Sequence, residues 1–330
     1  MADLSILTRS AFIKSFRDEV MLDRPVFAML YDHRRVTWKG GTDINQPIIK
    51  TSGAAALQWY GVNDGLTVTD RDYLAKATFG WKMAQFSIVY TVEDMIQNVY
   101  GGNEEKILDL VGMKVKQSQQ DVKEGLDTQL HNTTSAGDSG TKFQSIPEAC
   151  GHSRTYGTIA SNTTTVKYWN GASVAGTYTD VATAMALSLD RIRIIRSACS
   201  KYGTQRNRRF YLFMGTALYS KLIGLIEANH VLVAPGKLTK YGLTSIELYG
   251  NIEVVEDTWM TDNSMTTHLM FVDPESWELR FHPKRALEMT DFVDQSEQSN
   301  GKDQMVARIR LAGNSICWQP NANMYKSLVS

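Results

Sequence analysis

The feature that most restricts the fold of this chain is a long alternation of apolar and polar residues around residue 80. Apolar side chains occupy every second position there, which is the period of a β-strand: Ala75, Ala77, Phe79, Trp81 and Met83. The parity then shifts by one residue, and the apolar positions continue at Phe86, Ile88, Tyr90 and Val92. Such a shift turns every later side chain to the opposite face of a sheet, so we predict a β-bulge near 84–85 that absorbs it.

The segment before this strand predicts a hairpin partner. Residues 44–52 have an extended pattern, and 53–70 form a tip that contains glycine, alanine and asparagine together with Trp59 and Tyr60. An arm of about 18 residues would reach ~60 Å. A compact chain of 330 residues is only about 50 Å across. We therefore expect the ribbon to extend beyond the globule.

A ribbon of this kind has no core of its own. Phe79, Trp81 and Met83 share one of its faces, and soluble monomers avoid exposing apolar patches of that kind. A lone two-stranded ribbon is also marginally stable in water. We therefore expect it to lie on another copy of the protein through these intersubunit contacts: Trp59, Tyr60, Phe79, Trp81 and Met83.

Three helices follow from apolar residues spaced three and four apart. The longest is expected over 103–131, capped by Asn103, and its apolar stripe consists of Ile107, Leu108, Val111, Val115, Val122, Leu126 and Leu130. A second helix is expected over about 180–202, capped by Thr179, and a third is capped by Thr216. Short strands at 252–256, 268–273 and 277–282 and a long one at 304–318 complete an α+β class with partly segregated helices and strands.

Residues 1–43 are predicted to be an arm rather than a compact domain. Phe12, Phe16 and Val20 fall on one side of a short helix. Pro25 is expected to interrupt this helix, because proline lacks the amide that a helix interior requires.

Charge and composition exclude several classes of protein. The chain has 35 Lys and Arg against 35 Asp and Glu, which argues against a protein whose main affinity is for phosphate backbones. Hydrophobic residues make up 43% and charged residues 21%, as in ordinary globular proteins, so disorder is not expected. We expect no membrane span and no secretory signal. The three cysteines, Cys150, Cys199 and Cys317, are widely spaced and are expected to be reduced and buried.

Candidate catalytic groups are few. Gly137-Asp138-Ser139-Gly140 resembles the nucleophile motif of trypsin-like serine proteases over four residues only, and a polar turn is the favoured interpretation. Cys150 and His152 are two potential metal ligands or a nucleophile pair, but no partner pair accompanies them. Neither nucleotide-binding glycine motif occurs. Glu256 and Asp257 end a predicted strand and are expected to be solvated. Taken together, these motifs lead us to expect no cofactor site and no metal site.

One stretch departs from the even charge balance. Within 190–209, seven basic residues face only Asp190: Arg191, Arg193, Arg196, Lys201, Arg206, Arg208 and Arg209. A solvated helix face is the favoured interpretation, and contact with nucleic acid or with an acidic protein surface is the alternative. Arg193 and Arg196 are three apart and share a helix face, and a contact with a neighbouring subunit is preferred for them over DNA.

The order of these elements resembles that of a major capsid protein of tailed double-stranded-DNA phages, which has the Hong Kong 97-like fold. Residues 156–161 followed by Trp169 look like the passage of that family into its axial domain, and 251–257 and 270–273 look like its later strands. The resemblance implies an N-terminal arm (1–43), an extended β-hairpin loop (44–91), a peripheral domain (92–146) with its spine helix at 103–131, an axial domain (147–282) and a return to the peripheral domain (283–330).

The resemblance also implies a function. The chain would be a non-enzymatic shell protein that self-assembles into pentamers and hexamers of an icosahedral head around double-stranded DNA. It would be assembled in the host cytoplasm and reside in the virion. A separate scaffolding protein and a portal are the implied partners, and the DNA would be contacted weakly and without sequence specificity. An encapsulin-like compartment shell is the nearest alternative, and a small soluble hydrolase using Ser139 or Cys150 is the alternative from another class.

Overall fold

The computed structural model describes residues 24–33, 35–37, 40–49, 57–65, 74–93, 104–133, 140–151, 154–160, 169–172, 185–201, 208–228, 234–235, 245–249, 251–295, 302–327 and 329. The helix predicted from Phe12, Phe16 and Val20 lies outside these residues, as do Ser139 and His152.

Two larger sheets organise the described chain. The five-stranded sheet has the order β1 (Arg35–Thr37), β12 (Trp277–Met289), β14 (Gln304–Cys317) and β13 (Val293–Asp294), and β4 (Lys82–Thr91) also pairs with β14. The six-stranded sheet has the order β15 (Met324–Lys326), β11 (Leu269–Val272), β7 (Phe210–Met214), β10 (Ile252–Glu256), β9 (Ser245–Leu248) and β8 (Ala234–Pro235). Two small antiparallel pairs, β2 (Asp43–Ile49) with β3 (Leu74–Gly80) and β5 (Thr155–Tyr156) with β6 (Ile159–Ala160), complete the β structure.

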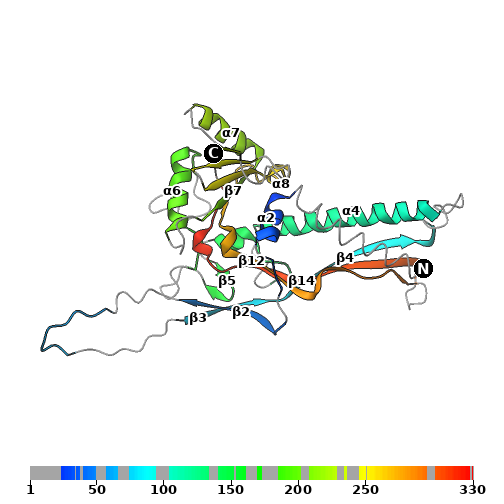
Figure 1. Ribbon diagram of the computed structural model, residues 1–330, viewed down its shortest axis with the longest axis horizontal. Helices are drawn as coiled ribbons and strands as arrows, with labels where there is room; N and C mark the ends of the chain where they lie inside the picture. Colours follow the sequence, from blue (N-terminus) through cyan, green and yellow to red (C-terminus); the bar gives the residue numbers. More distant parts are fainter. Residues whose placement is uncertain are drawn as a thin grey trace.

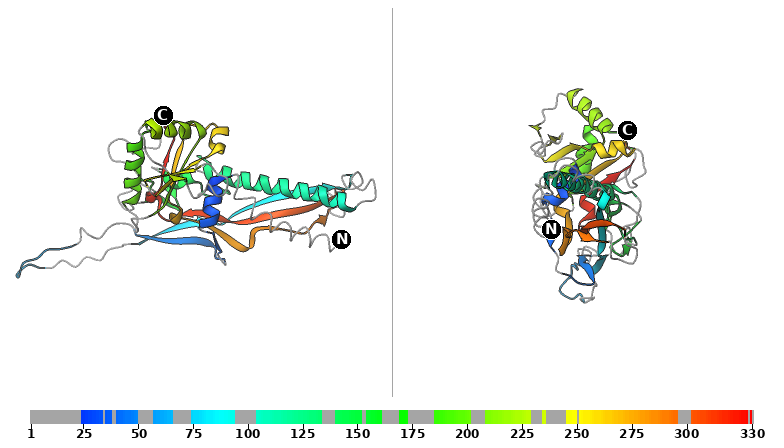
Figure 2. Two further views of the ribbon diagram at one scale, coloured as in Figure 1. Left: turned by 45° about the horizontal axis from the view of Figure 1, so that its top comes forward. Right: turned by 90° about the vertical axis from the view of Figure 1, so that its right-hand side faces the viewer.

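The helices are distributed between the two sheets. The longest, α4 (Glu104–His131), runs beside β4 and β14, and α2 (Pro25–His33) crosses it near its C-terminal end (Figures 1 and 2). Around the six-stranded sheet lie α6 (Leu189–Ser200), α7 (Thr216–Ala228) and α8 (Thr258–Asp262). The short α5 (Ile146–Cys150) and the 3-10 turns Pro274–Ser276 and Pro320–Ala322 connect the two regions.

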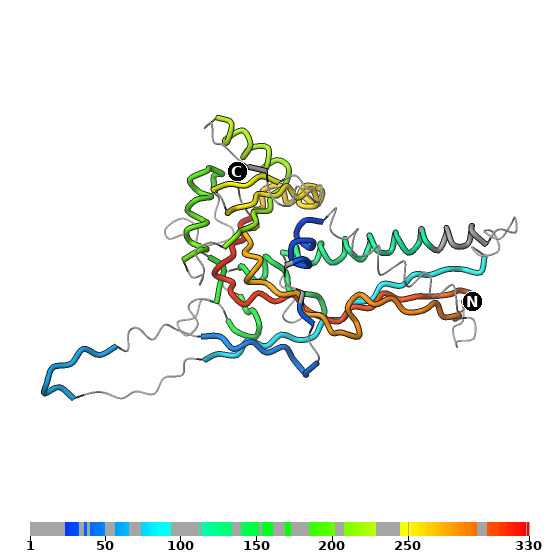
Figure 3. The backbone as a smooth tube through the Cα atoms, in the orientation of Figure 1, coloured from blue at the N-terminus to red at the C-terminus, as the bar shows by residue number. Residues whose placement is uncertain are grey.

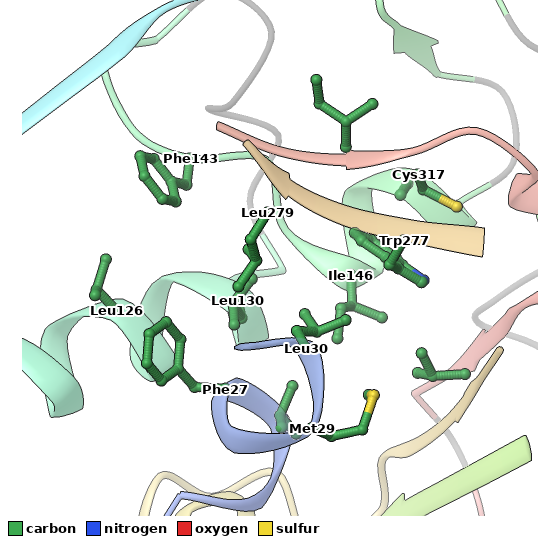
Figure 4. Packing of buried hydrophobic residues seen from close by; sticks show 14 of the residues in the cluster. Phe27, Met29, Leu30, Leu126, Leu130, Phe143, Ile146, Trp277, Leu279 and Cys317 are labelled. Atoms are coloured by element: carbon green, nitrogen blue, oxygen red, sulfur yellow. The ribbon is translucent and has the colours of Figure 1, made fainter. Parts of the chain in front are cut away.

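The described residues form two hydrophobic cores, and the six-stranded sheet contributes one face to each, with Tyr211 and Phe213 of β7 in the first core and Leu212 of the same strand in the second. The first core joins α2 and the C-terminal half of α4 to the five-stranded sheet, and Figure 4 shows Phe27 and Leu30 facing Leu126, Leu130 and Leu279. The second core lies between the six-stranded sheet and helices α6 and α7, with Ile192, Ile195, Leu218 and Leu222 fully buried. Burial of these stripes explains why the helices form where the apolar spacing predicts them.

Several predicted elements are confirmed. The long helix ends at His131 as expected, and Val115, Leu126 and Leu130 of its stripe are buried. The predicted strand at 252–256 is β10, and the long final strand is β14, in which Ala307, Ile309 and Leu311 are buried.

The predicted position of the bulge is wrong. β2 pairs with β3 only as far as Gly80, which lies opposite Asp43, and the chain then enters the five-stranded sheet as β4. The register of β4 against β14 is unbroken from Lys82 to Thr91, so residues 84–85 hold no bulge. The parity shifts at Trp81 because the chain changes sheets there and its two halves bury side chains against different neighbours. The two-stranded ribbon is therefore shorter than the predicted loop of 44–91.

Three further boundaries differ from the predictions. Helix α6 begins at Leu189 with Ser188 as its cap, whereas Met185, expected within the helix, forms a bridge with Val329. Pro25 begins helix α2 instead of interrupting a helix, because the first helical position needs no amide donor. The predicted limit at 282–283 does not coincide with the division between the sheets, since β12 crosses it and β15 belongs to the six-stranded sheet.

Candidate assembly surfaces

The tip of the β2–β3 loop projects from the rest of the molecule (Figures 1 and 3). A turn holds it, in which the Asp64 amide donates to the Gly61 carbonyl at 3.1 Å and the Asp64 carboxylate accepts from the Gly61 amide at 2.6 Å. Trp59 is 90% exposed and Tyr60 66%, and Leu57 and Val62 are exposed as well. An apolar group of this size in open solvent is typical of a surface that binds another protein.

The root of the same loop is fixed to the body. The Thr78 amide donates to the carbonyl of Gly157 at 2.8 Å, and the ring of Phe79 meets Tyr156 edge-on at 5.1 Å between centroids. Gly157 has a φ of 60°, and a Cβ there would lie 2.6 Å from the Phe79 ring. The β5–β6 turn therefore clamps the ribbon through a position that suits glycine.

The five apolar residues predicted to contact another copy do not share one environment. Phe79 is only 1% exposed, so its assignment to the ribbon's exposed face is wrong, because the β5–β6 turn covers it. Trp81 is half-buried, with its indole N–H donating to the Gly41 carbonyl at 2.9 Å. Met83 is 67% exposed and, with Trp59 and Tyr60, is accessible to a partner.

Three of the seven basic residues of the stretch pair with carboxylates of the same chain. Arg208 is buried and pairs with Asp273, and Arg209 lies 3.1 Å from Glu253 and 3.4 Å from Glu247. Arg193 pairs with Asp190 at 2.5 Å, and both side chains are exposed. Arg196 is half-exposed on α6. Among the described residues of the stretch, the exposed basic side chains therefore lie on α6 and at its C-cap, Lys201.

A buried charged cluster lies at the junction of α4, α2 and α8. His131 Nε2 lies 2.8 Å from a carboxylate oxygen of Asp257, and Nδ1 lies 2.8 Å from the backbone carbonyl of Asp127. The Asp127 carboxylate accepts from the Phe27 amide at 3.2 Å, and Trp259 stacks on the imidazole at 4.4 Å between centroids. Both ring nitrogens face acceptors, so both donate and the imidazole carries a positive charge.

The pKa of His131 agrees with this geometry. Burial alone lowers the pKa of His131, but the charges of Asp127 and Asp257 outweigh it and raise the pKa from 6.5 to about 9. Burial raises the pKa of Asp127 to about 6, although His131 opposes this shift and Asp257 adds to it. Asp257, expected to be solvated, is completely buried and also caps α8. Sequence reasoning missed the cluster; its one local signal is the four-residue spacing of Asp127 and His131.

Nothing in the described residues supports a catalytic site at Cys150. Its side chain is buried, and burial raises the pKa of its thiol well above the usual value, so the nucleophilic thiolate is disfavoured. Among the described residues, no group of three or more acidic, histidine or cysteine side chains is placed to hold a metal ion. In the part of the chain that the structure describes, no helix has the length and apolar character to cross a membrane.

The fold, in contrast, has clear structural relatives. A chain of the cyanophage A-1(L) capsid asymmetric unit matches with a TM-score of 0.64 and 14% identity, covering 93% of both chains. The capsid chain of a native GTA particle matches with a TM-score of 0.55 and 11% identity, covering 92% of this chain and 90% of the other. The chain has the Hong Kong 97-like fold. The fold expected from the order of elements is thereby confirmed.

The same fold also occurs outside phages. The encapsulin of the holo-SrpI complex from Synechococcus elongatus PCC 7942 matches with a TM-score of 0.56 and 8% identity, covering 93% of this chain and 88% of the other. No protein-family model matches the sequence, and no curated protein matches it. Because all three identities are below 15%, the likeness establishes the fold and leaves function to further argument.

Proposed function

We propose that this chain is the major shell protein of a tailed phage head, which assembles into pentamers and hexamers around double-stranded DNA. The observation that carries the proposal is the match to capsid chains along almost their whole length and that of this chain. The exposed aromatic tip supports it, because a side chain as apolar as Trp59 gains most from a neighbouring subunit.

The regions of the chain then acquire roles. Helix α4 is the spine helix, and together with the five-stranded sheet it belongs to the peripheral domain. The β2–β3 ribbon and its tip form the extended loop, and the six-stranded sheet with α6 and α7 forms the axial domain near the centre of each ring. We assign the N-terminal arm to the residues before Arg24 instead of the predicted 1–43, because α2 packs in the first core and β1 pairs with β12.

Particle size tests the proposal. The purified chain, alone or with a scaffolding protein, should sediment as pentamers, hexamers or megadalton shells and show closed particles by electron microscopy. A chain that stays a 37.0 kDa monomer at every concentration, with and without a co-expressed scaffolding protein, would overturn the proposal.

The cargo distinguishes a phage head from a compartment. The encapsulin likeness makes a protein-filled cellular compartment the second candidate. The phage role predicts nuclease-resistant double-stranded DNA in particles from the native source and their location in virions after assembly in the host cytoplasm. The balanced charge suits such a wall, because a strongly basic inner surface would hold the genome too tightly for packaging through a portal. Particles filled with one protein and free of DNA would favour the compartment.

A hydrolase is not proposed. Cys150 has no exposed thiol, and the part of the chain that contains Ser139 lies outside the described residues. The shell role requires no cofactor and no catalytic group.

A further inference from the structure

An apolar groove separates helix α4 from the five-stranded sheet. Val122 and Leu126 line it from the helix, and Phe86, Leu287 and Leu311 line it from β4, β12 and β14. Its volume is about 390 Å³. Gly125 also lines it, and a Cβ built on Gly125 would meet no atom within 4 Å, so the helix does not pack tightly against anything at this point.

The groove leaves apolar side chains partly uncovered. Val122 and Phe86 are half-buried, and Met83 at the groove's edge is exposed. A cavity of this volume has room for more than one large side chain. An apolar groove of this kind is stabilised when an apolar segment fills it.

The chain itself leads a segment to this groove. Helix α2 is held against α4 by the Phe27 amide, which donates to Asp127, and Arg24 lies 3.3 Å from Glu124. Glu124 is three residues after Asp121 and four before Thr128, two residues that line the groove, and residues at these spacings are neighbours on a helix surface. Residues before Arg24 therefore start beside the groove on its α4 side.

The sequence before Arg24 has the required apolar pattern. Phe12, Phe16 and Val20 recur every four residues, which is the spacing of an apolar stripe on a helix. Phe16 lies eight residue steps before Arg24, a path of about 12 Å if helical and about 26 Å if extended, so Phe16 reaches the groove in either form.

We propose that the groove between α4 and the five-stranded sheet binds the chain's own segment 12–20, with the Phe12 and Phe16 rings filling it. The segment thereby joins the helix to the sheet within one subunit. This proposal does not depend on the shell function, since it concerns contacts inside a single chain.

Disulfide trapping in the full-length chain tests the proposal. On a helix, Ser15 would lie one turn from Phe12 at the flank of the apolar stripe. Ser15→Cys combined with Gly125→Cys therefore keeps both aromatic anchors and puts one thiol in the segment and one in the groove. The native cysteines are buried and stay unreactive under mild oxidation. The matched control pairs Ser15→Cys with Gly112→Cys, a position about 20 Å along α4 and on another face.

The proposal predicts an intrachain disulfide in the Gly125 pair that forms at least tenfold faster than in the Gly112 pair. Adding Phe12→Ser and Phe16→Ser should slow its formation tenfold, whereas proximity through the tether alone would leave the rate unchanged. Equal rates with and without the phenylalanines, a missing crosslink, or disulfide-linked dimers in place of the intrachain product would each overturn the proposal, and dimers would identify a second copy as the occupant.

Discussion

His131 connects parts of the chain that no local pattern relates. Its carboxylate partner Asp257 is 126 residues away and caps α8, while Asp127 lies one turn earlier on α4 and accepts from the α2 amide of Phe27. The helix pattern predicts where α4 ends, but only the folded chain brings the second carboxylate to the imidazole. For this reason Asp257 looked like a solvated strand end in the sequence.

Replacing His131 with leucine should destabilise the subunit by about 3–5 kcal/mol, because two buried carboxylates would lose their counter-charge. Urea unfolding of the purified subunit measures the loss. The control is His282→Leu at a half-exposed histidine of β12, which should cost no more than about 1 kcal/mol. Equal losses of unfolding free energy in both variants would show that the buried cluster stabilises the subunit no more than a half-exposed histidine does.

The same cluster predicts how stability depends on pH. A pKa raised from 6.5 in the unfolded chain to about 9 in the folded protein means that the folded state binds the proton more tightly. The stabilisation is therefore complete below pH 6.5 and is lost as the pH rises through about 9. The free energy of unfolding should fall across this window in the wild type, and the fall should be absent from the His131→Leu variant.

Gly157 should be the residue most sensitive to a single added methyl group at the root of the loop. Gly157→Ala forces a side chain into a left-handed conformation and onto the Phe79 ring, at an expected cost of about 2 kcal/mol. Hydrogen exchange at the Thr78 amide, which donates to Gly157, should accelerate. Gly80→Ala is the control, since a Cβ there meets no atom within 4 Å; acceleration in both variants would contradict the clamp.

The limits of helices and strands were predictable where the whole apolar pattern of an element packs against a single core. Helix α4 and strand β14 each face the same core along their described length, so their periodicity gave nearly correct limits. The alternation around residue 80 instead spans two sheets, and the sequence does not mark the change at Trp81. The start of α6 was predicted too early for a related reason. Met185 lies before the helix, in a β-bridge, but its apolar side chain packs in the same core as the helix.

The packing of α4 on the sheet can be tested at its middle. Val115 is buried in the first core, so Val115→Asp should cost at least about 3 kcal/mol through an unpaired buried carboxylate. Gln117→Asp puts the same group on the exposed side of the helix and should cost less than about 1 kcal/mol. Thermal unfolding of the two variants provides the comparison, and similar melting temperatures would place Val115 outside the core.

The candidate assembly surfaces could be predicted only in part from the sequence. Trp59, Tyr60 and Met83 are exposed, and their contact with another subunit stays a prediction. The burial of Phe79 depends on the β5–β6 turn some 80 residues later. The basic stretch similarly contains arginines whose acidic partners, Asp273 and Glu253, come from distant parts of the chain. Long-range pairing of this kind leaves no mark on the local charge pattern.

The exposed end of that stretch is expected to meet a neighbouring subunit. Arg193→Glu with Arg196→Glu should leave subunit stability within about 1 kcal/mol, because an exposed ion pair such as Arg193–Asp190 contributes little. The variant should nevertheless fail to form capsomers in sedimentation, whereas the exposed Lys116→Glu on α4 should form them. Normal capsomers with a defect only in DNA packaging would instead assign the arginines to the DNA side.

The tip of the extended loop should affect assembly and nothing else. Trp59 and Tyr60 make no contribution to either core, and the loop places them beyond the body of their own subunit. Trp59→Ser with Tyr60→Ser should therefore leave the free energy of unfolding unchanged within about 0.5 kcal/mol. The lost apolar burial, about 25 cal/mol per Å² at each of many repeated contacts, should prevent closed shells from forming.

Val293→Ser removes another exposed apolar side chain, on β13, and serves as the control. Electron microscopy and sedimentation of both variants test the prediction, which expects closed shells from the control alone. Shells formed equally well by both variants would show that the tip does not hold neighbouring subunits together.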